Sequence, residues 1–490
     1  MRIIFFFFLL LWPVCLSAAS DSHGKNNVIV YPVPEGEVLN AAFIVSANGV
    51  DVPVYNVKVA KRKDYFGVKL APLELEQNFE IAGFAYFDMK KGRVKITVSI
   101  DEQVISAKVL PSSSGIIPAV KGKTVSFEVD KPQNVTVEVN GDHVCPLHLF
   151  VNPEERDIPN PNDPNVIYFG PGIHEITSMP IGENKTVYIA GGAIVRGMTG
   201  ADEAWSSSRN HPGLRHYGAS FILRGKNITF RGRGILDQEL VAAYNRRQMV
   251  NASVEGLKME GVILRNSSLW SVCLRKCRNV HIDNIKIMGY RSNSDGIDIC
   301  SSSDVLVENS FVRTFDDLIV VKTTIEGLDA DRMHIRRCVL WNECAHALSA
   351  GAELRGKVED VLFEECDVIA DNGRTWLLRI FHCQNAMVKN VRFENIRIEE
   401  VNNGFASLHI VQHYWSGNVQ ERGHIEDVVF RNITVDKGGG KFLKRQMEFE
   451  GYDAGHAINH VLIDNIEVCG KKISKEDVVM NDYVYNVKVK

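Results

Sequence analysis

The sequence predicts an all-β protein, a right-handed parallel β-helix preceded by a smaller N-terminal β-sandwich. Short runs that alternate apolar and polar residues, the period of a half-buried strand, fill most of the chain. In the second half these runs recur at a loose interval of about 29 residues, which is typical of a solenoid and would not arise in one large β-sandwich. Four aspartates also lie among the strand-like runs of Arg291 to Thr323, although carboxylates resist burial.

Length and charge exclude several classes of protein. At 490 residues the chain is too long for one ordinary core unless that core is elongated or repetitive. The chain has 56 Lys and Arg against 60 Asp and Glu, a formal net charge of -4. This balance gives no basic surface for nucleic acid and no acidic tail typical of disorder.

The N-terminus has the pattern of a secretory signal peptide. Arg2 precedes the apolar run Ile3 to Trp12, and small residues follow up to Ala19, so we expect residues 1–19 to be removed. A buried N-terminal strand is the alternative. Cys15 lies in a poor lipidation context, and no other apolar run is long enough to span a membrane. We therefore expect a secreted or periplasmic protein without a lipid anchor or a membrane span.

Residues 24–155 form the predicted sandwich. Runs such as VKITVSID and NVTVEVN alternate with turn dipeptides, namely Asn48-Gly49, Lys91-Gly92 and Asn140-Gly141. A stretch rich in Pro and Asn, from Asn152 to Asn165, resembles a linker to the next domain.

Residues 160–480 form the predicted β-helix. The repeated runs have a central Asn or Cys, at Asn284, Asn309, Cys338, Cys366, Asn395, Asn432 and Asn465. In a parallel β-helix each strand stacks on the previous coil, and Asn side chains at the turns can form hydrogen-bonded ladders. The stretch Asp237 to Met249 is the one helical pattern, and we expect it on the surface.

The ten cysteines give no metal site. Cys273 and Cys277 are four residues apart, but no nearby His or second Cys pair completes a zinc site. Several others, namely Cys300, Cys338, Cys366 and Cys469, lie in strand-like runs, where buried small side chains are expected. A few disulfides are possible but cannot be assigned. We expect no metal and no cofactor.

Coil stacking converts sequence spacing into contact. The runs Gly296 to Ile299 and Leu318 to Val321 align with an offset of 22 residues, which puts Asp295 over Asp317. The next coil puts His346 over Asp317. Asp316 is one residue earlier and turns aside, Arg379 lies one coil further, and Asp298 falls over Val320.

Such a group of carboxylates suits the hydrolysis of a glycosidic bond with inversion. One protonated acid donates to the leaving oxygen while a carboxylate activates water, and close like charges raise one pKa and leave another group ionised. Taken singly, Asp316-Asp317 could be a solvated turn and His346 a core histidine. A calcium site is a further alternative, but NSDGID lacks the twelve-residue loop that ends in Glu.

Here the sequence resembles the polygalacturonases, glycoside hydrolase family 28. Asn293 to Asp298 resembles their NTDG motif, and Asp316-Asp317 their paired aspartates. Ala345 to Ser349 resembles GHGLS, and Arg379 to Phe381 resembles RIK. The resemblance covers roughly residues 160–470.

The resemblance implies a role for each of these residues. Asp316 would be the general acid, Asp295 and Asp317 would hold and activate water, and His346 would support the acid. Substrate binding is expected from a group of polar and aromatic side chains, namely Asn293, Asp298, Lys322, Arg379 and Tyr414. The lysine of RIK is Phe381 here and both glycines around the histidine are alanines, which weakens the implication of an unmodified galacturonan.

The predicted function is therefore a secreted polygalacturonase-like hydrolase acting on a pectic polysaccharide. Three alternatives stay open. The N-terminal β-domain also resembles the layout of family 49 dextranases, which implies a neutral glucan. A calcium-dependent polysaccharide lyase on the same fold is the second alternative, and a carbohydrate-binding β-helix without catalysis is the third. The sugar, the mode of cleavage and the oligomeric state are not determined by the sequence.

Overall fold

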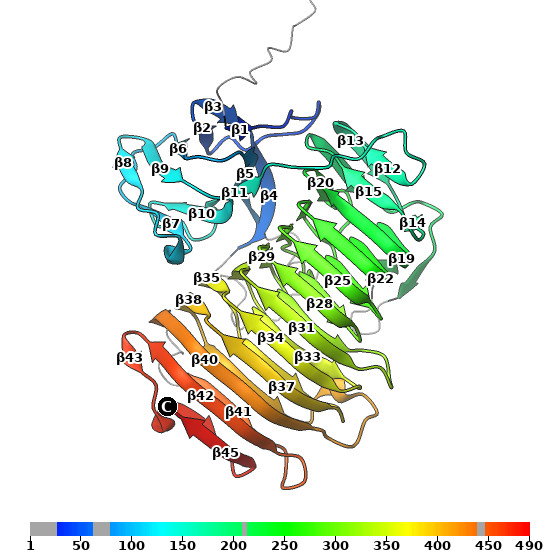
Figure 1. Cartoon of the computed structure of the whole chain (residues 1–490), viewed down its shortest axis with the longest axis vertical. Coiled ribbons are helices and arrows are strands. Elements are labelled where there is room, and N and C mark those ends of the chain that lie inside the picture. Colours follow the sequence, from blue (N-terminus) through cyan, green and yellow to red (C-terminus); the bar gives the residue numbers. More distant parts are fainter. Residues whose placement is uncertain (1–26, 62–78, 208–212, 439–445) are drawn as a thin grey trace, which may run out of the picture.

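A computed structural model describes residues 27–61, 79–207, 213–438 and 446–490. Within these ranges the protein is built from strands and a few 3-10 turns, which confirms the all-β prediction (Figure 1). The expected signal peptide, residues 1–19, lies outside the described residues. No helix in the described part of the chain is long and apolar enough to cross a membrane.

The N-terminal part consists of two packed sheets. The larger contains β1 (Val28–Ile29), β4 (Val54–Ala60), β5 (Phe79–Met89), β7 (Ala107–Leu110), β10 (Gln133–Val139) and β11 (Leu147–Pro153). The smaller contains β2 (Ile44–Ala47), β3 (Val50–Val52), β6 (Val94–Ser99), β8 (Ala119–Lys121) and β9 (Thr124–Val129). Alternate residues of the strands, such as Ile96, Phe87 and Val137, fill the space between the sheets. This is the arrangement of a β-sandwich.

The rest of the chain is the predicted right-handed parallel β-helix. One continuous 31-stranded sheet runs from β12 (Val166–Phe169) to β45 (Val484–Val489), the coil stack that passes from green to red in Figure 1. The strands pair in parallel with the equivalent strand of the next coil, except for the short antiparallel β43 (Lys471–Lys472). Inward side chains of successive coils stack on one another, as in the column Phe363, Phe393, Phe430 and Phe449 with ring centroids 5.0 to 6.1 Å apart.

The coil stack has three faces, each formed by equivalent strands of successive coils. The face that carries the candidate site consists of β24 (Val272–Arg275), β27 (Ile297–Cys300), β30 (Ile319–Thr323), β33 (Leu348–Leu354), β36 (Trp376–His382), β39 (Gly404–Ile410) and β41 (Met447–Glu450). A second face consists of β25 (Arg278–Asp283), β28 (Ser303–Glu308), β31 (Ala330–Arg336), β34 (Val358–Glu364), β37 (Met387–Glu394), β40 (His424–Gly438) and β42 (Ile458–Val468). The third consists of β23 (Ile263–Arg265), β26 (Lys286–Met288), β29 (Phe311–Thr314), β32 (Val339–Asn342), β35 (Asp367–Asp371) and β38 (Arg397–Val401).

The sandwich packs on the third face. Tyr55, Phe84 and Phe150 of the sandwich share a buried apolar cluster with Phe311 and Trp341 of the coils. Polar contacts flank this cluster, and one that is fully buried is the bond of the Arg233 guanidinium to the Asp88 carboxylate at 3.0 Å. The two parts of the chain are therefore joined by a packed interface as well as by the connecting segment.

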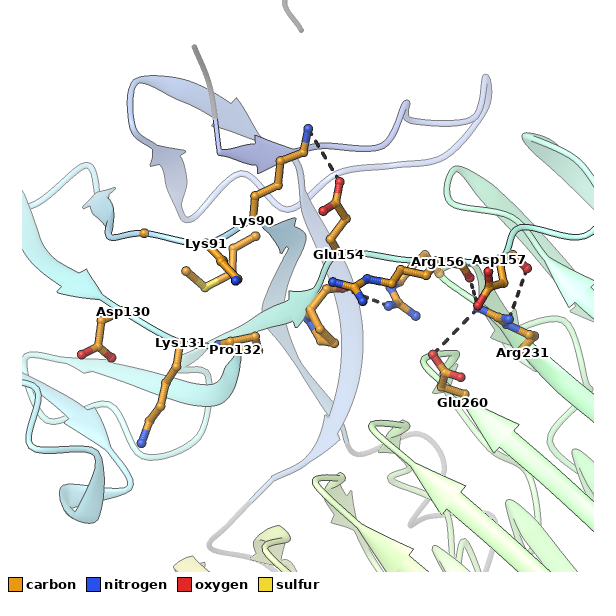
Figure 2. A pocket seen from close by; sticks show the side chains of 14 residues that line it. Lys90, Lys91, Asp130, Lys131, Pro132, Glu154, Arg156, Asp157, Arg231 and Glu260 are labelled. Carbon is orange, nitrogen blue, oxygen red and sulfur yellow. Dashed lines mark hydrogen bonds and ion pairs between the residues drawn. The ribbon is translucent and has the colours of Figure 1, made fainter. Parts of the chain in front are cut away.

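A charged cavity of about 510 Å³ lies at one edge of this junction (Figure 2). Lys90 pairs with Glu154 at 3.6 Å, and Arg231 of the coils reaches Glu260 at 3.9 Å. None of its lining residues belongs to the cavity that holds the predicted catalytic aspartates.

The turn column explains the repeated Asn residues and corrects their register. Asn284, Asn309, Asn395, Asn432 and Asn465 all have positive φ, a conformation that Asn tolerates better than most residues. The Asn465 amide donates to Asn432 at 2.8 Å and the Asn432 amide to Asn395 at 2.9 Å, which is the predicted ladder. In two coils, however, the turn position is Arg337 and Glu365, and Cys338 and Cys366 follow it as buried side chains.

The helix predicted for Asp237 to Met249 is wrong. This stretch contains the end of β20 (Ile235–Asp237), turns, and the short strand β21 (Asn245–Arg246). Gln238 and Arg247 are fully buried, and Gln238 bonds the hydroxyls of Ser220 and Ser268. These contacts with neighbouring coils override the local helical pattern.

All nine cysteines of the described residues are free thiols.

Candidate active site

A cavity of about 810 Å³ lies on the face formed by β24 to β36. Eight of the nine predicted site residues line it, namely Asn293, Asp295, Asp316, Asp317, Lys322, His346, Arg379 and Tyr414. The structure thus brings together residues that are up to 121 positions apart in the chain.

The carboxylates are positioned by the register of two neighbouring coils. Ile297 of β27 pairs with Ile319 of β30, so the predicted offset of 22 residues is confirmed. Asp295 precedes β27 and Asp317 precedes β30, and the backbone N–H of Gly296 donates to the carbonyl of Asp317 at 2.8 Å. Glycine is required here because a Cβ at Gly296 would lie 2.3 Å from the carbonyl oxygen of Leu318. One oxygen each of Asp295, Asp316 and Asp317 lies within 4.8 Å of the others.

Burial and mutual repulsion keep protons on these carboxylates. Burial, with the neighbouring Asp316 charge, raises the pKa of Asp317 to about 7. Burial raises the pKa of Asp295 well above its ordinary value. The negative charge of Asp298 adds to this shift, and the Lys322 ammonium opposes it. Asp295 is 2% exposed, whereas Asp316 and Asp317 are half-buried at the cavity surface. The pair of Asp295 and Asp317 can therefore hold a proton at neutral pH.

The structure corrects the predicted role of Asp298 in substrate binding. It lies over Val320 as the spacing predicts, but it is fully buried and does not line the cavity. The ammonium of Lys322 lies 2.8 Å from its carboxylate. Burial raises the pKa of Asp298 to about 8, although the Lys322 ammonium acts in the opposite direction. Asp298 thus supports the floor of the cavity from below and is not available to a sugar.

Lys322 lines the cavity but its charge is already shared. Besides Asp298, its Nζ lies 3.3 Å from Asp295 and 4.0 Å from Glu353. The ammonium also lies 4.1 Å from the centre of the Trp270 ring. A substrate carboxylate would therefore have to compete with three protein carboxylates for this cation.

His346 occupies the predicted column with Asp317. The backbone N–H of Leu318 donates to the carbonyl of His346 at 2.9 Å, which confirms the second coil offset. Its Nδ1 lies 2.7 Å from the carbonyl oxygen of Trp376, so Nδ1 carries the proton and donates. Nε2 then accepts from Arg379 Nη1 at 3.2 Å and lies 3.9 Å from Asp317. Burial and Arg379 lower the pKa of His346 well below 6.5, which keeps the ring neutral.

Arg379 and the residues of one loop form the wall of the cavity. Arg379 pairs with Ser349 in the neighbouring coil, and its guanidinium lies 4.1 Å above the Phe381 ring. Tyr414 begins the turn η2 (Tyr414–Ser416) and is 73% exposed, and its ring is tilted against that of Trp415 with centroids 4.8 Å apart. Asn293 is half-buried with a positive φ of 57°.

Several lining residues were missing from the predicted set, among them Trp270, Glu353 and Arg374. Trp270 is two residues before Val272, which pairs with Ile297, so Trp270 lies in the column of Asp295. Extending the coil offset by one coil would have found it. Glu353 follows a register shift between β30 and β33, and the exposed Arg374 lies in a loop. No spacing rule predicts the position of either residue.

The described residues offer two groups of side chains that could hold a metal ion. One is the carboxylate group of Asp295, Asp316 and Asp317. The other, on the same face but further along the coils, is His409, Glu448 and Glu450. The first already has a resident positive charge, since Lys322 lies 3.3 Å from Asp295.

The chain is similar to polygalacturonases in its second half. The profile of Glycosyl hydrolases family 28 matches residues 241–483. The chain is 26% identical over 191 residues to exopolygalacturonase clone GBGE184 of Arabidopsis thaliana, covering 37% of this chain and 42% of that protein. It is 24% identical over 238 residues to an exopolygalacturonase of Zea mays, covering 44% and 56%. The chain thus spans about half the length of the curated relatives it matches.

Solved structures share the fold. Dex49A from Penicillium minioluteum has a TM-score of 0.63 at 12% identity, covering 95% of this chain and 97% of that one. The polygalacturonase from Erwinia carotovora ssp. carotovora has a TM-score of 0.51 at 17% identity, covering 64% and 86%. The first likeness extends over both the sandwich and the coils. Through residues 241–483, which include every predicted site residue, the chain is a polygalacturonase-like member of glycosyl hydrolases family 28.

Proposed function

We propose that this protein is a secreted glycoside hydrolase that cleaves a pectic polysaccharide with inversion of the anomeric carbon. The observation that carries the proposal is the group of Asp295, Asp316 and Asp317, whose oxygens approach within 4.8 Å at the floor of an 810 Å³ cavity. Membership of family 28 and the printed names of the exopolygalacturonase relatives support a pectic substrate.

The three carboxylates divide the work of the reaction. Asp316 protonates the leaving glycosidic oxygen, and Asp295 and Asp317 hold the attacking water and take its proton. Asp295 Oδ1 and Asp317 Oδ1 are buried and accept no hydrogen bond from any residue that the structure describes, so a water bound between them would satisfy both oxygens. The raised pKa values of Asp295 and Asp317 mean that this pair holds a proton near neutral pH, and passing that proton to Asp316 leaves a carboxylate that can take one from water.

The surrounding residues orient the substrate and the acids. His346 stays neutral and holds the Arg379 guanidinium through its Nε2 lone pair, 3.9 Å from Asp317, so it supports the acids through that cation and not through a charge of its own. Arg379 supplies a cation with a planar fork for a sugar carboxylate or hydroxyls. Asn293 and Tyr414 line the cavity, where the exposed Tyr414 ring offers a surface for a sugar face. Lys322 contributes positive charge from the floor.

The spacing of the carboxylates makes the stereochemical outcome a sharp test. Inverting glycosidases usually separate their two carboxyls by about 6.5–9.5 Å and retaining ones by about 5–5.5 Å. The nearest oxygens here are closer than the inverting range. We propose inversion because two carboxylates on neighbouring coils can hold one water together, a role that a two-carboxylate retaining site does not provide. NMR of the first product anomer decides the question, and a retained anomer overturns the inverting step.

The activity itself is tested by a substrate screen. Wild type and Asp316→Asn are incubated with pectic, neutral glucan and algal polysaccharides, and released reducing ends are measured. Wild type should act on a pectic chain, and the variant should lose about 10²–10⁴-fold in rate, since general acid catalysis is worth that much. Products that carry a double bond, formed only with calcium present, would show a lyase instead. Equal activity of the two proteins would contradict the proposed acid.

Export is a separate part of the proposal. It is supported by the apolar run Ile3 to Trp12 and the small residues that end at Ala19. Sequencing the N-terminus of the protein recovered outside the cytoplasm should show a mature chain that begins after Ala19. Recovery of a chain with an intact Met1 from the cytoplasm alone would contradict it.

A further inference from the structure

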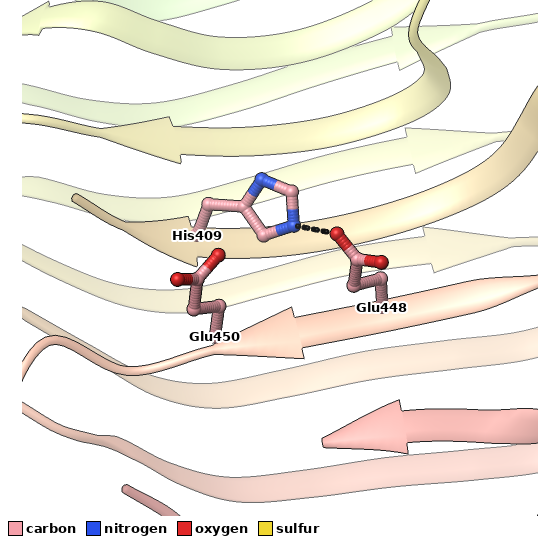
Figure 3. Close-up of side chains that lie close together, drawn as sticks. All are labelled: His409, Glu448 and Glu450. Atoms are coloured by element: carbon pink, nitrogen blue, oxygen red, sulfur yellow. Dashed lines mark ion pairs between the residues drawn. The ribbon is translucent and has the colours of Figure 1, made fainter. Parts of the chain in front are cut away.

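Three further residues continue the line of polar side chains beyond Arg379. On the next strands of the same face, β39 carries His409 and β41 carries Glu448 and Glu450 (Figure 3). Arg379 Nη2 lies 3.4 Å from His409 Nδ1, and His409 Nε2 lies 3.3 Å from Glu448 Oε1. His409 is only 6% exposed, so its ring is held by these neighbours.

Charge decides which nitrogen of His409 carries the proton. The guanidinium of Arg379 faces Nδ1, where a second N–H would oppose a donor and a cation. The carboxylate of Glu448 faces Nε2, where an N–H is stabilised. The Nε2 contact is an ion-pair distance without the alignment of a hydrogen bond, so the attraction is mainly electrostatic. His409 therefore takes the Nε2–H tautomer and offers a lone pair to Arg379.

Arg379 is thereby held between two imidazole rings, each with one nitrogen facing the guanidinium. Its Nη1 donates to His346 Nε2 at 3.2 Å and its Nη2 faces His409 Nδ1. Burial lowers the pKa of Arg379 to about 10, so its charge needs acceptors around it. The guanidinium plane also lies over the Phe381 ring. These contacts set the direction in which the fork points.

We propose that Glu448 is a positioning residue for Arg379, acting through His409. Its carboxylate holds the Nε2–H tautomer, and the free Nδ1 lone pair then orients the guanidinium toward the cavity. The consequence for turnover rests on the proposed function, in which Arg379 grips the substrate. The tautomer itself does not depend on any activity.

The same residues could instead be the ligands of a cation, and the two possibilities make opposite demands. A metal such as zinc needs the Nε2 lone pair and both glutamates, whose ligand atoms lie within 4.8 Å of one another. The positioning role needs Nε2–H and Glu448 alone. The exposed Glu450 pairs with His409 in the sheet. It is therefore the matched control for Glu448.

The tautomer is measured by ¹⁵N NMR of the histidine rings, with His409→Gln identifying the signal. Wild type should show His409 with Nε2 protonated and Nδ1 bare. Glu448→Ala should shift this signal, and Glu450→Gln should leave it unchanged. An Nδ1–H tautomer, or no shift in Glu448→Ala, overturns the proposal. A zinc site would also overturn the proposal. In that case zinc chloride, added to chelator-treated protein, would move the His409 signal in wild type but not in either glutamate variant.

The consequence is measured by kinetics on the polysaccharide that the screen identifies. Glu448→Ala should raise KM by about tenfold, the size expected when one hydrogen bond to a charged group is weakened. Glu448→Gln keeps an acceptor and similar volume and should recover part of this loss, and Glu450→Gln should match wild type. Wild-type KM and kcat in Glu448→Ala would overturn the proposal while the proposed function stands. If wild type cleaves no polysaccharide, the proposed function fails and the NMR result still decides the role of Glu448.

Discussion

Lys322 and Asp298 form an ion pair beneath the cavity floor, with Nζ of one 2.8 Å from Oδ1 of the other. The pair joins two neighbouring coils, because Cys300 of β27 is opposite Lys322 of β30. The same ammonium lies 3.3 Å from Asp295. One lysine therefore supports two buried carboxylates, which explains how several aspartates can lie among strands that are otherwise core.

Removing Lys322 should destabilise the protein strongly. Lys322→Met leaves Asp298 and Asp295 buried without their cation, and breaking a buried pair in this way costs about 3–5 kcal/mol. Urea unfolding measures the loss. Adding Asp298→Asn should recover part of it, because the second change removes the unpaired charge. A single variant as stable as wild type would show that the pair contributes nothing.

The raised pKa of Asp317 predicts a pH dependence of stability. Its pKa rises from an ordinary 3.8 to about 7, so the folded protein keeps a proton that the unfolded chain has lost. This contribution is present below about pH 4 and is lost as pH rises to about 7. Asparagine at position 317 cannot titrate. The free energy of unfolding of Asp317→Asn, relative to that of wild type, should therefore increase as pH rises over this range. Urea unfolding at several pH values tests this, and parallel curves would contradict it.

His346 should remain neutral across the physiological range. Burial and the Arg379 cation lower its pKa well below 6.5, and its Nδ1–H is held by the Trp376 carbonyl. The NMR signal of its ring, assigned with His346→Gln, should show no titration midpoint near the ordinary value of 6.5. A midpoint near 6.5 would mean that the ring is more solvated or less close to Arg379 than its contacts indicate.

The asparagine ladder should contribute to stability in two separable ways. Asn432 has a φ of 51°, accepts from Asn465 and donates to Asn395. Asn432→Gly removes the two ladder bonds but keeps the backbone conformation, and should cost about 1 kcal/mol. Asn432→Ala also strains the backbone and should cost about 1 kcal/mol more. Equal midpoints of the two variants in thermal unfolding would show that the turn carries no conformational preference.

The column of site residues was predictable because a coil offset is a backbone property. The spacings of 22 and 29 residues placed Asp295 over Asp317 and Asp317 under His346, and the strand registers confirm both. The same rule would have added Trp270. It could not add Glu353, because the register shifts after Val321 and a one-residue change alters which face a side chain points to.

The local sequence pattern predicted secondary structure less reliably where side chains bind to residues of other coils. The apparent helix around Gln238 and Arg247 gave way to turns, since both side chains are buried among neighbouring coils. Cys338 and Cys366 matched the asparagines by their neighbours in sequence, but the turn in those coils falls on Arg337 and Glu365. Similarity of a run therefore located each coil to within one residue.

Periodic strands, turn residues and coil spacing were sufficient to predict the β-helix, the sandwich and the aspartate column, because each follows from the backbone geometry of stacked parallel strands. The division of the aspartates needed the folded chain. Whether Asp298 meets a sugar or a lysine depends on how far the Lys322 side chain reaches between coils and on how much water burial removes. The same holds for Arg379, whose direction is set by His346 and His409 from strands on either side.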